Sequence, residues 1–155
     1  MFDETEGLAG ILHYHGKLLE MHKLKIQVSM GMKTIDDMKE EVRRSNKGAF
    51  NVGNILALDF SRLVPDFKNQ IFDTPFVPPC LFKPSEFAKD GVWDKTLKDG
   101  ENKDPWGGEG QAMVRPGYGI VVISIGDPSD PDTQKEFEEA LPLEDFHIIK
   151  LVKNE

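Results

Sequence analysis

Three of the four histidines of the chain lie within one short segment, Ile11 to His22, which reads ILHYHGKLLEMH. Imidazole nitrogens bind transition metals and exchange protons near neutral pH, so this segment is the first place to look for chemistry. On a helix, His15 and His22 would stand ~10.5 Å apart along the axis, and His13 and His15 would point to opposite sides. A metal needs both nitrogens within ~2.1 Å, so a helix here cannot hold one by itself.

A strand would change this conclusion, because His13 and His15 would then share one face and could bind a metal together. His147, near the other end of the chain, is the one histidine left to act as a third ligand. The spacing of the apolar residues favours a helix, so we expect no metal and no cofactor. A metal-dependent enzyme that uses His13, His15 and His147, with Glu20 or Asp127 assisting, is retained as an alternative.

The other candidate reactive groups lack the neighbours that their chemistry needs. The sequence around Cys80 shows no base that would lower the pKa of its thiol, and neither Ser61 nor Ser124 lies in a GxSxG motif. The loop GDPSDPDT fails the calcium-loop pattern, because the sixth position counted from Asp127 is not glycine. The glycine-rich stretch WGGEGQAM precedes no helix that could hold a phosphate. We therefore expect no catalytic residue and no enzymatic activity.

Length and composition indicate one soluble globular domain, residues 1–155. Hydrophobic residues make up 39% of the chain and charged residues 30%, which is ordinary for such domains. The longest apolar run, Ile120–Ile125, is far shorter than the ~20 residues of a membrane span, and the acidic N-terminal segment is unlike a secretion signal. A single cysteine fits a reducing compartment. We expect a location in the cytoplasm or within an assembled particle, without membrane insertion.

The net charge of −8 excludes the basic surface that nucleic-acid binding needs, so no direct nucleic-acid contact is expected. Most of the excess negative charge lies at the C-terminal end, where residues 117–155 carry nine acidic and three basic side chains. This asymmetry supports a second alternative function, an acidic inhibitor that binds a basic protein.

The first part of the chain, residues 7–46, has the apolar spacing of helices. It predicts one helix over residues 7–22, followed by residues 23–30, which could be helix or strand. A second helix should begin at Thr34, where Thr34 and Asp37 form a capping box, and should close at Ser45–Gly48.

The last part, residues 117–155, predicts a strand, a helix and a strand. The segment YGIVVISIG is β-branched and uninterrupted, as in a buried strand. Asp130 should cap a helix over Pro131–Leu141, and Phe146–Val152 should form a second strand. Gly53–Val64 should supply a further strand. These elements indicate an α+β fold, or a small α/β fold, with N-terminal helices packed on a mixed sheet.

The middle part, residues 65–116, predicts a long irregular arm rich in proline, glycine and phenylalanine. It holds seven of the ten prolines and two Asp-Gly turn signals, which exclude long helices and strands. Its aromatic side chains need cover, either from the arm's own domain or from a neighbouring molecule. We predict an interface formed by Phe67, Phe72, Phe76, Phe82, Phe87, Trp93 and Trp106.

These observations favour a non-enzymatic structural or assembly subunit of a larger complex. A proline-stiffened arm loses less entropy on binding, and its aromatic rings supply contacts. The partners would be other protein subunits or further copies of the chain. By analogy, small proteins of virus particles, including phages, have this profile.

Overall fold

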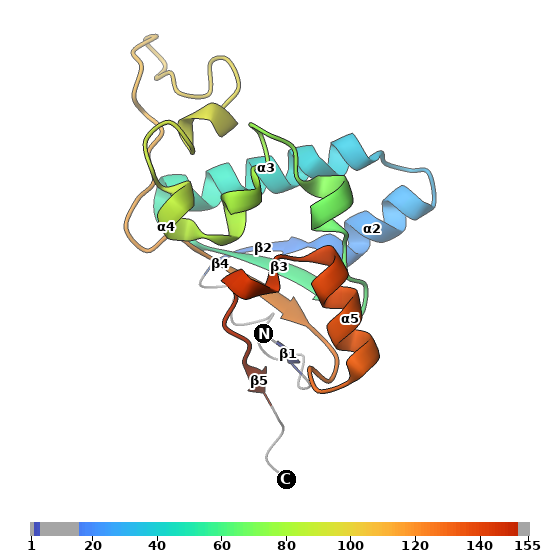
Figure 1. Ribbon diagram of the computed structural model, residues 1–155. Coiled ribbons are helices and arrows are strands. Elements are labelled where there is room, and N and C mark those ends of the chain that lie inside the picture. The colour runs from blue at the N-terminus through green and yellow to red at the C-terminus, as the bar shows by residue number, and fades with distance from the viewer. Residues whose placement is uncertain (1, 4–15, 152–155) are drawn as a thin grey trace.

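The computed structural model describes residues 2–3 and 16–151. The strands in these residues form one five-stranded sheet in the order β2-β3-β4-β1-β5 (Figure 1). Every pairing between neighbouring strands is parallel. The fold is therefore a small α/β fold, and the predicted mixed sheet was wrong. The strands are β1 (Phe2–Asp3), β2 (Gly16–Glu20), β3 (Ile55–Ser61), β4 (Gly119–Ser124) and β5 (Lys150–Leu151).

The predicted helix over residues 7–22 was wrong where the structure describes it. Gly16–Glu20 is strand β2, paired in register with β3 from Gly16 opposite Ile55 to Glu20 opposite Asp59. Helix α2 (Met21–Ser29) begins only afterwards and includes most of the segment that could have been helix or strand. The apolar spacing was that of a helix, but pairing with β3 satisfies the backbone groups of this segment and overrides the local pattern.

Helix α3 (Ile35–Val52) begins where the capping box predicted. The hydroxyl of Thr34 accepts a hydrogen bond from the backbone N–H of Asp37 at 3.1 Å, and the Asp37 carboxylate accepts one from the Thr34 N–H at 2.8 Å. The helix does not close at Ser45–Gly48 but continues through Gly48 to a cap at Gly53. Gly48 therefore lies inside the helix, where it packs against the side chain of Lys17 on β2.

The C-terminal part follows the prediction as far as helix α5 (Pro131–Ala140). The Asp130 carboxylate accepts the N–H of Thr133 at 2.9 Å, which makes it the expected cap. The strand predicted from Phe146 is wrong over its first residues, since strand pairing begins only at Lys150. The reason is aromatic packing: the ring of Phe146 lies 4.9 Å from that of Phe82, between centroids, and holds the chain away from the sheet.

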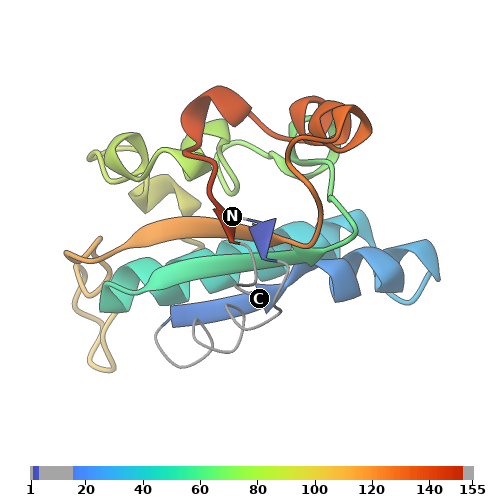
Figure 2. The same ribbon diagram turned by 90° about the horizontal axis from the view of Figure 1, so that it is seen from below.

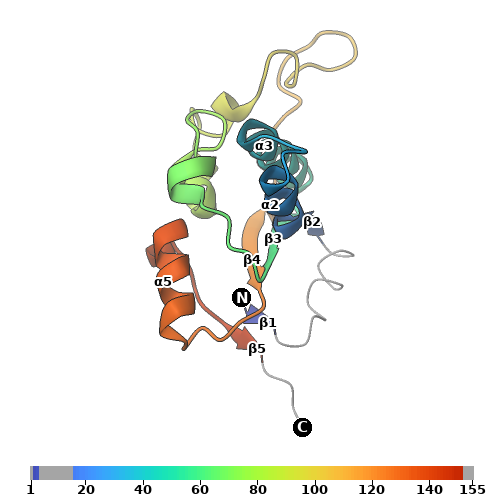
Figure 3. The ribbon, with the colours of Figure 1, turned by 90° about the vertical axis from the view of Figure 1, so that its right-hand side faces the viewer.

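The arm contains only short helices, as its prolines predict. They are a π-helical turn at Phe67–Ile71, 3-10 turns at Pro79–Phe82 and Asp94–Thr96, and α4 (Pro84–Phe87). Figure 3 places α5 and the short helices that follow β3 on one side of the strands, and Figure 2 shows them stacked above the sheet. A further 3-10 turn, Leu143–Asp145, follows α5. None of the helices that the structure describes is long and apolar enough to cross a membrane.

One hydrophobic cluster joins α3, the sheet, the arm and α5. Its rings form a chain of contacts: Phe137 on α5 stacks on Phe60 of β3, Phe60 stacks on Phe67 in the arm, and Phe67 meets Phe82 edge to face. Burying each ring stabilises the fold by ~2 kcal/mol or more. The arm is therefore part of the core of the chain and covers one face of the sheet.

Replacing Phe67 with alanine should lower the free energy of unfolding by ~3–5 kcal/mol, because it leaves a cavity among fully buried rings. Phe76→Ala is the matched control from the same arm. Its ring is 38% exposed, so we expect a loss below ~1 kcal/mol. Urea denaturation followed by circular dichroism measures both. Equal losses in the two variants would contradict the packing described.

Candidate functional site

Most of the predicted histidine site lies outside the residues that the structure describes. His13 and His15 lie outside the described residues, and His147 is exposed near the C-terminal end. Glu20 is paired with Lys23 at 2.6 Å, and Asp127 with Lys150 at 3.1 Å. Within the described part of the chain, no three His, Cys, Asp or Glu side chains gather closely enough to hold a metal ion.

The seven aromatic residues of the predicted interface divide into three groups. Five are covered by other parts of the same chain: Phe67, Phe82 and Phe87 are buried in the core, and Phe72 and Trp93 pack against it. Phe76 is 38% exposed, with the ammonium of Lys98 5.7 Å from its ring centroid. Trp106 is 90% exposed. The accessible part of the predicted interface is thus Phe76 and, above all, Trp106.

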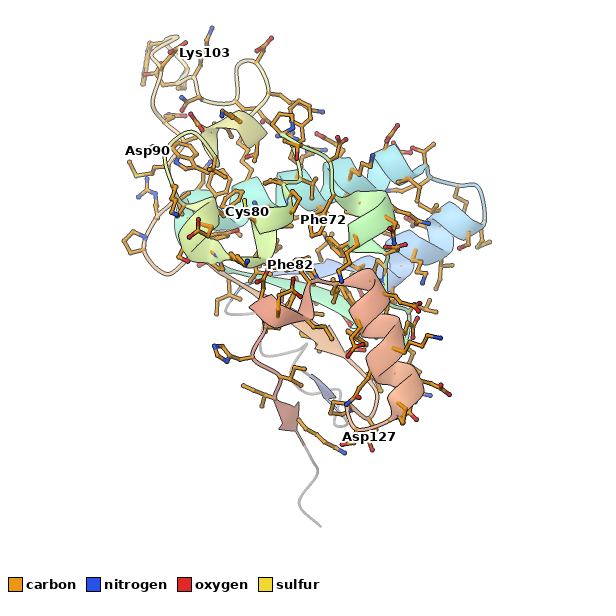
Figure 4. The ribbon with its side chains drawn as sticks, in the orientation of Figure 1. Phe72, Cys80, Phe82, Asp90, Lys103 and Asp127 are labelled. Carbon is orange, nitrogen blue, oxygen red and sulfur yellow. The ribbon has the colours of Figure 1, made fainter. Side chains whose placement is uncertain are left out.

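Trp106 lies in a segment that projects from the body of the molecule, here called the Trp106 loop and defined as residues 98–113 (Figure 1, top). Figure 4 marks Lys103 near its outer end, far from Asp127 at the opposite end of the molecule. An antiparallel bridge between Lys103 and Glu109 closes its outer part. The loop therefore presents Trp106 away from the hydrophobic core.

The backbone on both sides of Trp106 is held by one carboxylate. Oδ1 of Asp104 accepts the N–H groups of Trp106 at 2.8 Å and of Gly108 at 2.7 Å, while the Asp104 N–H donates to the Gly108 carbonyl at 2.8 Å. Gly107 has a φ of 86°, in the left-handed region that favours glycine. The exposed indole thus sits on a turn with a fixed conformation.

The returning part of the loop is tied to the domain. Within the loop, the side-chain oxygen of Asn102 accepts the Ala112 N–H at 2.9 Å. The side-chain oxygen of Asn51 on α3 accepts the Met113 N–H at 3.1 Å. Arg115 then donates its N–H to the carbonyl of Phe50 at 3.0 Å. These contacts connect the loop to the last turn of α3.

The outgoing part is anchored by a buried guanidinium. Arg43 of α3 is 3% exposed, and its N–H groups donate to both oxygens of Glu40 at 2.7 and 2.9 Å and of Glu101 at 2.6 and 3.0 Å. A further bond to the Thr96 carbonyl at 3.0 Å uses its fifth N–H. Lys98 adds an ion pair with Glu40 at 2.7 Å. The base of the loop is therefore cross-linked to the middle of α3.

This cluster shifts the titration of its members. Hydrogen bonds from Arg43 lower the pKa of Glu40 to about 2 and the pKa of Glu101 to about 2, despite the opposing effect of burial. The same bonds raise the pKa of Arg43. All three groups are therefore charged at neutral pH, and the cluster persists over the whole physiological range.

This cluster was not predicted from the sequence. The spacing of Glu40 and Arg43 by three residues is a visible signal for their pairing. Glu101 lies 58 residues away, so no local pattern connects it with Arg43.

An apolar cavity at the other end of the molecule is too small to be a ligand site. It lies between β4, α5 and the chain that follows α5, and it encloses about 40 Å³, far below the ~300 Å³ of typical small-molecule pockets. Its lining includes Val122, Phe137, Leu141, Leu143 and Phe146, with His147 beside them.

No protein-family model, no curated protein and no solved structure matches this chain. The function therefore has to be argued from the residues and their geometry.

Arg43→Met should lower the free energy of unfolding by ~3 kcal/mol, because it leaves the carboxylates of Glu40 and Glu101 without their main partner. Arg44→Met is the matched control, since Arg44 is the exposed neighbour on the same helix, and its loss should stay within ~0.5 kcal/mol. Chemical denaturation measures both values. A similar stability for the two variants would show that the cluster does not hold the loop base.

Acid should weaken the same cluster. The folded-state pKa of Glu101 is about 2, below its usual value of 4.5, so the unfolded chain takes up the proton first as the pH falls. The stabilisation is complete above about pH 5 and is lost between about pH 4.5 and pH 2. Glu101→Gln should therefore flatten the fall of stability over this range, whereas Glu109→Gln, at an exposed position of the loop, should leave it unchanged. Denaturation midpoints across this pH range test the prediction.

Proposed function

We propose that the protein is a structural or assembly subunit that binds a neighbouring protein through the Trp106 loop. The observation that carries the proposal is the 90% exposure of Trp106 on a turn whose conformation is fixed on both sides. Tryptophan is highly buried on average in folded chains, and it is enriched among residues that dominate binding energy in protein interfaces.

The way the loop is held supports binding rather than incidental exposure. An interface residue contributes most when little conformational entropy is lost on association. Asp104 fixes the turn at the tip, and Arg43 and Asn51 fix the two ends of the loop. The backbone that carries the indole is therefore held in a defined conformation before a partner binds.

The shape of the loop favours a macromolecular partner. The loop lines a hollow of about 400 Å³, but Trp106 is not among its lining residues. A small ligand needs a concave site that encloses most of its surface, whereas an indole that is 90% exposed makes contacts by entering a groove on another molecule. The partner would be another protein subunit or a second copy of the chain. Small components of virus particles and of other large complexes offer an analogy only.

The acidic surface of α5 supports the alternative of an inhibitor of a basic protein. Its exposed face carries Asp132, Glu136, Glu138 and Glu139 against Lys135. The two functions respond differently to salt: binding through carboxylates falls steeply as salt rises, and binding through an indole persists. The metal-dependent enzyme stays a separate prediction, because His13 and His15 lie outside the described residues.

Trp106→Ala should weaken assembly by ~30-fold or more, which corresponds to ~2 kcal/mol of binding free energy. Met32→Ala is the matched control, because Met32 is also a large exposed apolar residue, at 68%, on the turn between α2 and α3. Light scattering coupled to size exclusion measures the mass of each variant, alone and with the neighbours that co-purify with the wild-type chain.

The stability of the Trp106→Ala variant should match that of the wild type, because an indole so exposed contributes little to the core. Loss of assembly in this variant, with assembly retained in Met32→Ala at low and high salt, is the expected result. Equal masses for the wild type and Trp106→Ala under all conditions would refute the proposal.

A further inference from the structure

A second group of polar side chains lies at the carboxyl ends of β2 and β3, away from the Trp106 loop. Asp59 is on β3 and pairs in register with Glu20, the last residue of β2. His22 follows in the first turn of α2. Its Nδ1 lies 3.2 Å from the backbone oxygen of Asp59 and 3.6 Å from the carboxylate oxygen Oδ2 of the same residue.

The position of Asp59 is fixed by the strand ends around it. Its Oδ1 accepts the N–H of Ser61 at 2.8 Å, and Ser61 has a φ of 51° where the register between β3 and β4 shifts. The Ser61 carbonyl accepts the hydroxyl of Ser124 at 2.8 Å and the N–H of Ile125 at 2.7 Å. A left-handed conformation at a residue other than glycine persists only where its surroundings hold it, and such positions gather at functional sites.

This geometry assigns the proton on the His22 ring. Both oxygens of Asp59 that face Nδ1 are acceptors, so Nδ1 carries the hydrogen and Nε2 keeps a free lone pair. The His22 side chain is 20% exposed. Every buried side-chain nitrogen or oxygen in the described part of the chain has a partner, whereas Nε2 has none, so Nε2 is accessible to solvent.

The location suits a ligand. In open sheets of parallel strands, ligands bind outside the carboxyl ends of the strands. The carboxylates of Glu20 and Asp59 disfavour an anion there, and the ammonium of Lys23 is neutralised by Glu20 at 2.6 Å. The net negative charge of these groups therefore disfavours an anionic compound and admits an uncharged one.

We propose that His22 is the proton acceptor of a second site, which activates water for attack on an uncharged ester, and that Asp59 is its positioning residue. This goes beyond the binding function of the Trp106 loop. In the step, Nε2 removes a proton from water as the water oxygen bonds to the ester carbonyl carbon. The bond to the leaving oxygen breaks and its electron pair leaves with the alkoxide or phenoxide. The proton on Nε2 then passes to solvent.

Nitrogen NMR of the wild-type protein tests the ring geometry without any variant. At about pH 9, where imidazole is neutral, long-range ¹H–¹⁵N correlations should place the hydrogen of His22 on Nδ1. A free histidine in water prefers the hydrogen on Nε2, and the exposed His147 serves as this internal reference. A hydrogen on Nε2 of His22 would overturn the proposal.

Hydrolysis of p-nitrophenyl acetate tests the chemistry. We expect His22→Gln to lower the rate that the full-length protein adds to buffer by at least about twofold, with a comparable loss in Asp59→Asn, whose amide oxygen can still accept the Ser61 N–H. His147→Gln should keep the wild-type rate. Circular dichroism confirms that each variant is folded. If folded His22→Gln and Asp59→Asn hydrolyse the ester as fast as the wild type, the proposal is wrong, whatever the NMR result.

Discussion

The parallel pairing of β3 with β4 constrains the rest of the structure. Two adjacent parallel strands cannot be joined by a tight turn, because the chain must return along the whole strand before it can pair again. In most α/β proteins a helix makes this return and covers the sheet. Here the return is made by the arm, whose prolines exclude a long helix. Its phenylalanine side chains, foremost Phe67, Phe82 and Phe87, supply the apolar layer that a helix would otherwise provide.

An irregular crossover has a cost that a helix does not have, because its backbone groups and its position are not fixed by a regular hydrogen-bond pattern. Arg43 compensates for this at the point where the arm passes α3. Removing a guanidinium from water costs several kcal/mol, and only a full set of partners offsets this cost. Glu40, Glu101 and the Thr96 carbonyl provide such a set. Because two of these partners belong to the arm, the same bonds that make the buried charge tolerable also fix the base of the Trp106 loop.

Local signals in the sequence predicted the helices whose first turn is fixed by residues close to it in sequence. Thr34 with Asp37, and Asp130 followed by proline, each begin a helix through hydrogen bonds within three residues, so the starts of α3 and α5 could be predicted. Strand β2 could not, because its identity comes from pairing with residues about forty positions away. The bond from Arg43 to Glu101 joins residues 58 positions apart, and the ring pair Phe67–Phe82 joins residues that no helical or strand periodicity connects.

Composition was informative about the arm in a different way. It established that the aromatic side chains need cover, and it left open whether that cover comes from the chain itself or from a neighbour. The structure places five of the seven against the chain's own core. The exception with the greatest exposure, Trp106, stands in the sequence DPWGG, whose aspartate and glycines form a turn rather than a packed segment. Turn chemistry, more than aromatic content, was thus the signal for an accessible ring.

Parallel strands also separate the two candidate surfaces. All amino ends of such a sheet lie at one edge and all carboxyl ends at the other. The Trp106 loop returns to the last turn of α3 and leads into the start of β4, at the amino edge. His22 and Asp59 lie at the carboxyl edge. The seven residues of β3, at ~3.3 Å each, put ~20 Å between these edges. A protein seated on the indole therefore need not cover the imidazole, and the two surfaces can act independently in one small domain.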